Sequence, residues 1–254
     1  MAKKRSVLAD ARSWATQRGL FGAQAFLRYV ILRFTQNLNE ASDEFVFKGG
    51  NLLWIYINTP RATTDLDLAT LQATSHSKVR SLLERACKID SEIEFKVIAF
   101  NEVTQDEKIG AAVTLSYSTG QGATNQFEAD IVYAIETDAK SIASPLGEEK
   151  TIQAASIENI IADKLAACHR FGAGNTRMKD FDDLWRLSKS ALSIDTATLK
   201  RLMRSRKIET SLNAGWIAES MERSWRSHAA RYKDLPTNLT SVFDEVNRWL
   251  ESIR

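Results

Sequence analysis

The sequence predicts an α+β fold, in which a mixed β-sheet flanked by helices is followed by a C-terminal helical region. Segments that alternate polar and apolar residues, as strands do, occur before Pro145, where helical patterns are interleaved with them. Beyond Pro145 the apolar residues recur at helical spacing almost to the end of the chain. Strands and helices do not alternate regularly, which argues against a Rossmann domain. We therefore expect an α/β core in residues 1–145 and a helical region in residues 146–254.

The first half of the chain contains the beginning of the expected sheet. Residues 22–38 carry apolar side chains at helical spacing and predict a buried amphipathic helix. The segment EFVFKGG predicts a short strand that ends at a glycine turn, and LDLAT predicts a second strand. Between them, NLLWIYI is compatible with a helix or a strand, because its periodicity does not separate the two. The segment SHSKVRSLLERACKI predicts a helix with Ser75 or Ser77 as its N-cap.

Longer strands are expected next, and helices fill the second half. The strands come from the β-rich segments IEFKVIAF, AAVTLSYS and QFEADIVYAI. The first of the C-terminal helices, SIENIIADKLAACHRF, opens with Ser156. Four more helical segments follow: RMKDFDDLWRLSKS, DTATLKRLMRSRK, TSLNAGWIAESMERSWRSH and LTSVFDEVNRWLESIR.

Composition places the chain among ordinary globular proteins and argues against a membrane span, a disulfide framework and a zinc site. Of its 254 residues, 44% are hydrophobic and 26% are charged, and no apolar run is long enough to span a bilayer. The basic start MAKKRSVL has no apolar segment behind it and is a poor secretory signal, and the lack of a disulfide pattern favours a reducing cytoplasm, so we expect a cytoplasmic protein without a membrane partner. Cys87 and Cys168 lie far apart and the histidines have no ligand spacing, which argues against a disulfide framework and a zinc site. With a net charge of +2, any affinity for nucleic acid must come from a local patch.

Asp65 and Asp67 are the first candidate metal ligands. In an extended TDLDLA segment they share one face, while Leu66 and Leu68 turn into the core. Neighbouring carboxylates repel each other unless a cation lies between them, and an all-oxygen ligand set suits Mg²⁺. A solvated strand end with acidic side chains is the alternative, and it is the commoner explanation for an isolated D-x-D.

The segment QFEADIVYA repeats this arrangement with Glu128 and Asp130. Asp130 alternates with apolar neighbours in a run that resembles a core strand, so we expect it to be buried. A buried carboxylate without a partner costs several kcal/mol, and a metal shared with Asp65 and Asp67 would supply the partner. Three convergent carboxylates are typical of two-metal phosphoryl transfer.

The glycine pair Gly49 and Gly50 follows the first expected strand. Glycines let the backbone turn sharply and approach a ligand closely, and N–H groups at the start of a helix can hold phosphate oxygens. The Walker pattern G-x-x-x-x-G-K-[ST] is absent. A plain strand-to-helix turn is the alternative for the glycines, and a surface lysine is the alternative to a triphosphate contact for Lys48.

Taken together, the segments FKGGNLLW, RATTDLDL, FEADIV, SIENIIADKLAA and RMKDFDDLW resemble the AbiEii-type nucleotidyltransferases. This abortive-infection and toxin family has a DNA polymerase β-like nucleotidyltransferase fold, and the resemblance runs from about residue 45 to residue 190. The blocks of the family pattern fall, in order, on Lys48, Gly49 and Gly50, on Arg61, Thr63, Asp65 and Asp67, on Asp130, and on Glu158, Ala162, Lys164, Asp180 and Asp183.

Three residues depart from the family pattern. Asn51 stands where serine or threonine is usual after the glycines, and Thr63 replaces a serine while keeping a hydroxyl. Lys179 directly precedes Asp180, where an arginine is commoner. No departure removes a metal carboxylate, so the departures bear only on the choice of nucleotide.

The resemblance implies a Mg²⁺-dependent enzyme that moves an NMP from an NTP to an acceptor hydroxyl while pyrophosphate leaves. Asp65 and Asp67 would bridge the Mg²⁺ ions, and Asp130 would hold the ion that activates the hydroxyl. Lys164 and Asp180 complete the implied catalytic set, and the C-terminal helices are expected to complete the active-site cleft. The implied nucleotide-binding set is Lys48, Gly49, Gly50, Asn51, Arg61, Thr63 and Lys164.

Lys164 lies off the apolar stripe of its expected helix. It is therefore either a solvated side chain or, as the resemblance implies, a contact to the triphosphate. Asp180 would orient Lys164 or act as a base, and Asp183 would be a cap or an ion-pair partner on the same helix face. Arg61 is expected to anchor the loop before Asp65.

The acceptor implied by the resemblance is RNA, tRNA in particular, and a separately encoded antitoxin is the implied protein partner. Residues 200–207, KRLMRSRK, hold five cations that would lie along an RNA backbone or form an ordinary solvated helix face. Transfer to a protein hydroxyl, kinase-like use of the same site, and an inactive relative that binds RNA or a partner are the alternative functions. The intact carboxylate trio argues against an inactive relative, because like charges are costly to keep together.

Overall fold

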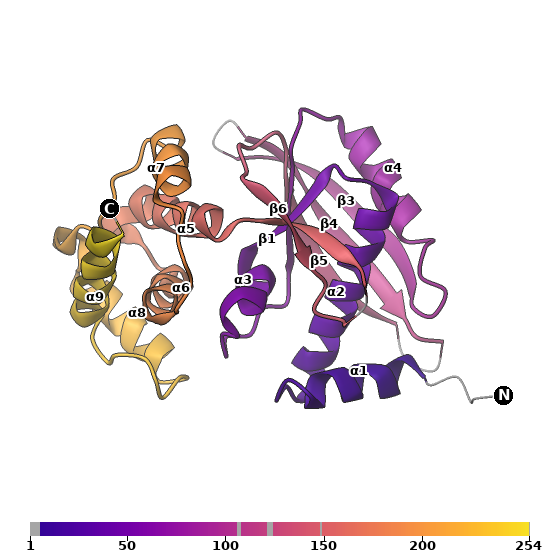
Figure 1. The fold of residues 1–254 in the computed structure, drawn as a ribbon, viewed down its shortest axis with the longest axis horizontal. Coiled ribbons are helices and arrows are strands. Elements are labelled where there is room, and N and C mark those ends of the chain that lie inside the picture. The colour runs from indigo at the N-terminus through magenta and orange to yellow at the C-terminus, as the bar shows by residue number, and fades with distance from the viewer. Residues whose placement is uncertain (1–5, 106–107, 121–123, 148, 254) are drawn as a thin grey trace. The chain divides into compact units, whose positions relative to one another are not determined.

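The computed structural model describes residues 6–105, 108–120, 124–147 and 149–253. The chain divides into two compact units (Figure 1). The first comprises Met1–Ile55 and Arg61–Ala155, and the second comprises Tyr56–Pro60 and Ser156–Arg254. No helix in the described ranges combines the length and the hydropathy that a membrane span requires.

A mixed β-sheet forms the centre of the first unit. Among the described residues its strand order is β3-β4-β5-β2-β1-β7-β6. The β2–β5 and β1–β7 pairs are parallel, and the other neighbouring pairs are antiparallel. The strands are β1 (Phe45–Lys48), β2 (Leu66–Thr70), β3 (Glu94–Gln105), β4 (Lys108–Ser118), β5 (Asn125–Val132), β6 (Ala139–Ala143) and β7 (Thr151–Ala155). This mixed sheet with its flanking helices confirms the predicted α+β class.

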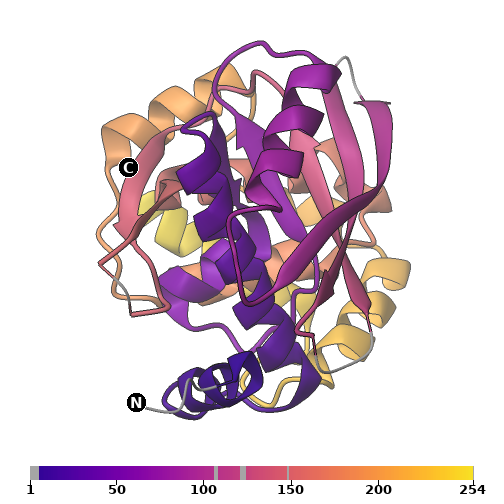
Figure 2. The ribbon, with the colours of Figure 1, turned by 90° about the vertical axis from the view of Figure 1, so that its right-hand side faces the viewer.

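Helices α1 (Val7–Thr16), α2 (Gly22–Ala41) and α4 (His76–Ala86) pack together in the first unit. Figure 2 shows α2, coloured indigo, crossing in front of the strands. The ring of Phe34 on α2 lies 5.9 Å from that of Phe127 on β5, so α2 covers the face of the sheet that Phe127 occupies. The N-cap of α4 is Ser75, whose hydroxyl accepts a hydrogen bond from the amide of Lys78.

The structure resolves one ambiguous segment and corrects one expectation. NLLWIYI belongs to a helix, α3 (Gly49–Ile57), that starts at the glycine pair. The chain after Pro145 does not become helical at once, because Thr151–Ala155 forms β7. This strand is too short to show a period, and its partners β1 and β6 are identified only by tertiary pairing. The division between the compact units accordingly falls between Ala155 and Ser156.

The described residues of the second unit form helices joined by loops, without a strand. Ser156 caps α5, as expected, and its hydroxyl accepts from the amide of Asn159 at 3.2 Å. Phe181 and Phe243 pack with their ring centroids 5.1 Å apart in the core of this unit. Its α-helices are α5 (Ile157–Phe171), α6 (Met178–Lys189), α7 (Thr196–Ser205), α8 (Glu219–Ala229) and α9 (Leu239–Ser252), with short 3-10 turns η1 (Gly172–Gly174) and η2 (Ala214–Trp216).

Candidate active site

Three aspartates, two on neighbouring strands and one just before the first of them, lie close together in the first unit. β2 and β5 run parallel, and their register places Asp67 directly opposite Asp130. Asp65 precedes β2 by one residue and projects to the same side as Asp67, because side chains two apart in extended chain share a face. One carboxylate oxygen from each of Asp65, Asp67 and Asp130 lies within 4.8 Å of the others.

The donor set of this trio fits a magnesium ion. Mg²⁺ binds oxygen at about 2.0–2.1 Å, so two ligand oxygens on one ion are separated by about 4 Å or less. The separations within the trio approach this value without any change of fold. The mutual repulsion of three carboxylates is also relieved when a divalent cation binds between them.

Asp130 is exposed, which corrects the expectation that it is buried. The strand around it is half-buried: Phe127, Ala129 and Ile131 face the core, and Glu128 and Asp130 face away from it. The apolar neighbours on the other face made the segment look like a core strand. Asp130 therefore needs no metal to offset its burial, and its place in the trio depends on its position opposite Asp67.

The glycine turn contacts the same aspartates. Lys48, the last residue of β1, is paired in register with Asp67. Gly49 has a φ of +74°, which disfavours any residue with a side chain, and a Cβ atom there would overlap the carboxylate of Asp67. A Cβ atom on Gly50 would likewise overlap the side chains of Arg61 and Thr63. The two glycines thus allow the backbone to reach groups that any other residue would displace.

The start of α3 has the features of an anion site. The helix begins at Gly49, so the first N–H groups of α3 have no partner within the helix and carry its positive dipole end. The hydroxyl of Thr63 faces Gly50, is buried, and has no hydrogen-bond partner among the described residues. A buried hydroxyl without a partner is rare, and a phosphate oxygen at the turn would supply one.

Asn51 uses its side chain for contacts within the protein. It is 1% exposed, and its Nδ2 donates to the backbone carbonyl of Asp65 at 2.8 Å. Its Oδ1 accepts from Nε of Arg28 at 3.2 Å. Arg61 is also buried, in contact with the glycine turn. Arg28 belongs to none of the sequence motifs, because it lies on a helix whose pattern indicates only burial.

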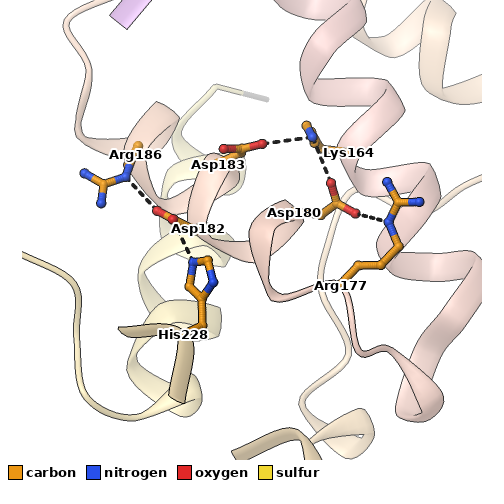
Figure 3. A network of polar contacts seen from close by, with 7 residues as sticks. All are labelled: Lys164, Arg177, Asp180, Asp182, Asp183, Arg186 and His228. Atoms are coloured by element: carbon orange, nitrogen blue, oxygen red, sulfur yellow. Dashed lines mark hydrogen bonds and ion pairs between the residues drawn. The ribbon is translucent and has the colours of Figure 1, made fainter. Parts of the chain in front are cut away.

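Lys164, Asp180 and Asp183 form a separate cluster in the second unit (Figure 3). Nζ of Lys164 lies 2.8 Å from Oδ1 of Asp180 and 2.8 Å from Oδ2 of Asp183, and both carboxylates are buried. The Lys164 side chain is only 13% exposed, so it is not a solvated lysine. Asp180 and Asp183 lie one helical turn apart on α6 and therefore reach the same ammonium group.

Arg177 is a member of this cluster that the sequence motifs did not identify. Its Nε donates to the second oxygen of Asp180 at 2.8 Å. Burial favours a higher pKa for Asp180, but the charges and hydrogen bonds of Lys164 and Arg177 outweigh burial and hold that pKa below its ordinary value. Asp180 is therefore an ionised group that holds Lys164 in place.

The neighbouring carboxylates of the second unit have structural partners. Asp182 is buried between Nε of Arg186, at 2.6 Å, and Nε2 of His228, at 2.8 Å (Figure 3). Glu158 is 1% exposed and accepts from the amide of Asp195 at 2.8 Å, so it joins α5 to the start of α7. Ala162, a further family position, is fully buried. These contacts indicate a role in stability for Asp182, Glu158 and Ala162.

In the basic segment 200–207, one arginine forms an ion pair within the second unit and other cations are exposed. Arg206 binds Asp163 through Nη2 at 2.7 Å and so ties α7 to α5. Leu202 and Met203 are buried, whereas Arg201, Arg204 and Lys207 are exposed.

Comparison with known proteins identifies nucleotidyltransferases as similar to this chain. The family model "Nucleotidyl transferase AbiEii toxin, Type IV TA system" matches residues 34–250. A crystal structure described as a nucleotidyltransferase from Helicobacter pylori has a similar fold, with a TM-score of 0.54 and 18% identity over 92% of this chain and 96% of that one. The structure of JHP933 from Helicobacter pylori gives a TM-score of 0.53 and 17% identity over 92% and 93% of the two chains. None of the curated proteins matches this sequence.

Proposed function

This chain belongs to the AbiEii family of nucleotidyltransferase toxins from type IV toxin–antitoxin systems, and from that premise we propose that it transfers an NMP from an NTP to a hydroxyl group of RNA. The reaction would use Mg²⁺ as its cofactor and take place in the cytoplasm, and tRNA is the first acceptor to test. The observation that carries it is the trio Asp65, Asp67 and Asp130, whose carboxylates lie within 4.8 Å of one another beside the turn at Gly49.

The reaction forms a bond between the acceptor oxygen and the α-phosphorus and breaks the bond from that phosphorus to the bridging oxygen of the β-phosphate. Pyrophosphate leaves with the electron pair of the broken bond, and the acceptor hydroxyl gives its proton to solvent water as the new bond forms. When bound, Mg²⁺ would offset the phosphate charge and lower the pKa of the attacking hydroxyl. Little covalent chemistry is required of the protein, so positioning and charge dominate.

The residues around the glycine turn would bind the triphosphate. The N–H groups of the first turn of α3, which have no partner within the helix, would bind the anion, and the hydroxyl of Thr63, which has no partner among the described residues, would donate to a phosphate oxygen. Lys48, which directly precedes Gly49, and Arg61, which lies beside Gly50, would add positive charge at the turn. Asp65, Asp67 and Asp130 would hold the metal on the strand face next to it.

Lys164 is proposed as a further phosphate ligand, with Asp180 as the residue that positions it. The pairing of Lys164 with two buried carboxylates keeps an ammonium group in one place. For the RNA, the support comes from exposed cations on α7 and just after it: Arg201, Arg204 and Lys207. An antitoxin partner follows from the type of system to which the family belongs.

The proposal is tested by incubating the protein with total RNA, Mg²⁺ and each of the four NTPs in turn, labelled at the α-phosphate. We expect label on RNA that is lost with EDTA and in the variants Asp65→Asn and Asp67→Asn. Glu128→Gln is the matched control, because Glu128 lies on the same face of β5 and its side chain accepts from Thr114 at 2.9 Å instead of joining the trio. Label on protein, or transfer from a γ-labelled NTP, would contradict the proposal.

A further inference from the structure

Arg28 is a buried arginine on α2, outside the residues 34–250 that the family model matches. It is 6% exposed, and its guanidinium group lies 4.6 Å from the ring centroid of Trp54 on α3. Nε donates to Oδ1 of Asn51 at 3.2 Å, and Nη2 donates to the backbone carbonyl of Arg61 at 3.3 Å. One side chain therefore contacts both the helix that starts at the glycine turn and the segment that leads to the carboxylates.

The contacts of Arg28 extend to both ends of segment 61–65. It binds the carbonyl of Arg61 directly, and it binds Asn51, whose Nδ2 donates to the carbonyl of Asp65 at 2.8 Å. Between these two carbonyls lies Thr63, whose unpartnered hydroxyl faces Gly50. The guanidinium fork suits this arrangement, because its rigid donors can reach two acceptors in different directions at once.

Among the residues that the structure describes, none offsets the charge of Arg28 with a carboxylate. Within the described part of the chain, its hydrogen bonds go to an amide and a carbonyl, and no carboxylate forms an ion pair with it. Burial and the nearby charge of Arg61 lower the pKa of Arg28 to about 10, which still leaves it charged at neutral pH. Buried charges are normally paired, so the guanidinium group of Arg28 behind the glycine turn favours an anion at that turn.

We propose that Arg28 is a positioning residue for the nucleotide, which fixes segment 61–65 against the start of α3 and keeps positive charge behind the triphosphate. The nucleotide part of this inference rests on the proposed function. The turn that Arg28 supports would hold the phosphates and not the base, so loss of Arg28 should weaken the binding of all NTPs alike.

Arg33 provides a matched control on the same helix. Nη2 of Arg33 lies 2.7 Å from Asp90 and 3.4 Å from Glu92, and its side chain is 16% exposed. It is thus a second arginine of α2 with little exposure, whose ion-pair partners are carboxylates remote in sequence from the glycine turn and whose Nη1 donates to the hydroxyl of Tyr29. Arg33→Gln should lower the melting temperature and leave nucleotide binding unchanged.

The test compares Arg28→Gln, Arg28→Lys and Arg33→Gln by calorimetric titration with Mg²⁺ and each of the four NTPs, and with inorganic tripolyphosphate. We expect Arg28→Gln to weaken all five probes by about tenfold or more, since charged hydrogen bonds are lost. Arg28→Lys keeps a charge without the two-directional fork, so it should recover only part of the affinity. It also serves as the second variant if the glutamine substitution does not fold. Equal affinities for the wild-type protein and both Arg28 variants, or equal losses in Arg28→Gln and Arg33→Gln, would overturn the positioning role.

Hydrogen exchange of residues 58–68 without nucleotide separates this inference from the proposed function. We expect faster exchange in this segment for Arg28→Gln and not for Arg33→Gln. If the wild-type protein binds none of the five probes, the proposed function fails, and faster exchange would still support the contact of Arg28 with segment 61–65. Unchanged exchange in Arg28→Gln would overturn that contact whether or not nucleotide binds.

Discussion

Asp67 and Asp130 lie side by side in register on two parallel strands, although more than sixty residues separate them in the chain. Each strand has a buried apolar face, so the carboxylates have only the opposite face available. Two like charges in this arrangement repel each other in the absence of a cation. Removing one of them should therefore change both the metal affinity and the melting temperature.

Asp67→Asn and Asp130→Asn should each weaken metal binding without destabilising the protein. We expect the transferase activity to fall by roughly a hundredfold or more, because several kcal/mol of charge stabilisation depend on the bound ion. The melting temperature without metal should stay the same or rise, since repulsion is removed. Titration with Mn²⁺ in place of Mg²⁺ would measure the binding, and unchanged Mn²⁺ affinity in both variants would contradict a metal role.

Gly49→Ala should cost more stability than an ordinary glycine substitution. Its φ of +74° alone costs an alanine about 1–2 kcal/mol, and the added methyl group must also displace the Asp67 carboxylate. Gly19→Ala is the control, because Gly19 has a φ of +65° and open space around the site of its Cβ. Urea unfolding of both variants gives the cost of the overlap as a difference, and equal losses would show that Asp67 can move aside.

Asp180 should make the second unit sensitive to acid. Its folded-state pKa lies below that of the unfolded chain, so the charged form stabilises the fold above about pH 4. This stabilisation is lost as the pH falls through the folded-state pKa. Asp180→Asn should cost about 3 kcal/mol or more at pH 7, because Lys164 loses a buried partner, and much less at low pH. Urea unfolding at several pH values measures this, with the exposed Asp244→Asn as control; a loss independent of pH would contradict it.

Arg204→Glu should weaken RNA binding if α7 lies along the acceptor. Arg204 is exposed on the side of α7 away from the buried Leu202 and Met203. Removing one phosphate contact should reduce the slope of log K against log salt by about one and leave NTP affinity unchanged. Arg223→Glu on α8 makes the same change of charge at a side chain that is 71% exposed. Equal effects of the two variants on filter binding would indicate that only the overall charge matters.

Local patterns were sufficient for many of the elements. The helix at residues 22–38, the cap at Ser75 and the inward-facing Leu66 and Leu68 all agree with the sequence prediction. Each depends on periodicity or on a hydrogen bond within a few residues. The short strand β7 was missed because it has no such local signal and is stabilised by partners far along the chain.

The sequence also predicted some residues of the candidate site and missed others. The motifs identified Asp65, Asp67 and Asp130, and the structure brings them together. They did not identify Arg28 or Arg177, because an arginine in an amphipathic helix or next to a loop has no distinctive spacing. The expected burial of Asp130 was wrong, because a strand with apolar alternate residues can have one face open to solvent.

The sequence by itself determined which side chains share a face, because the periods of helix and strand are properties of the local backbone. It also determined where the chain turns, since Gly49 is the residue type that a left-handed bend favours. The tertiary structure alone decided that Asp130 lies beside Asp67 and that Arg28 reaches Asn51 and Arg61. Such neighbours are selected by the packing of the whole sheet and its helices, and the free energy of that packing is not contained in any single segment.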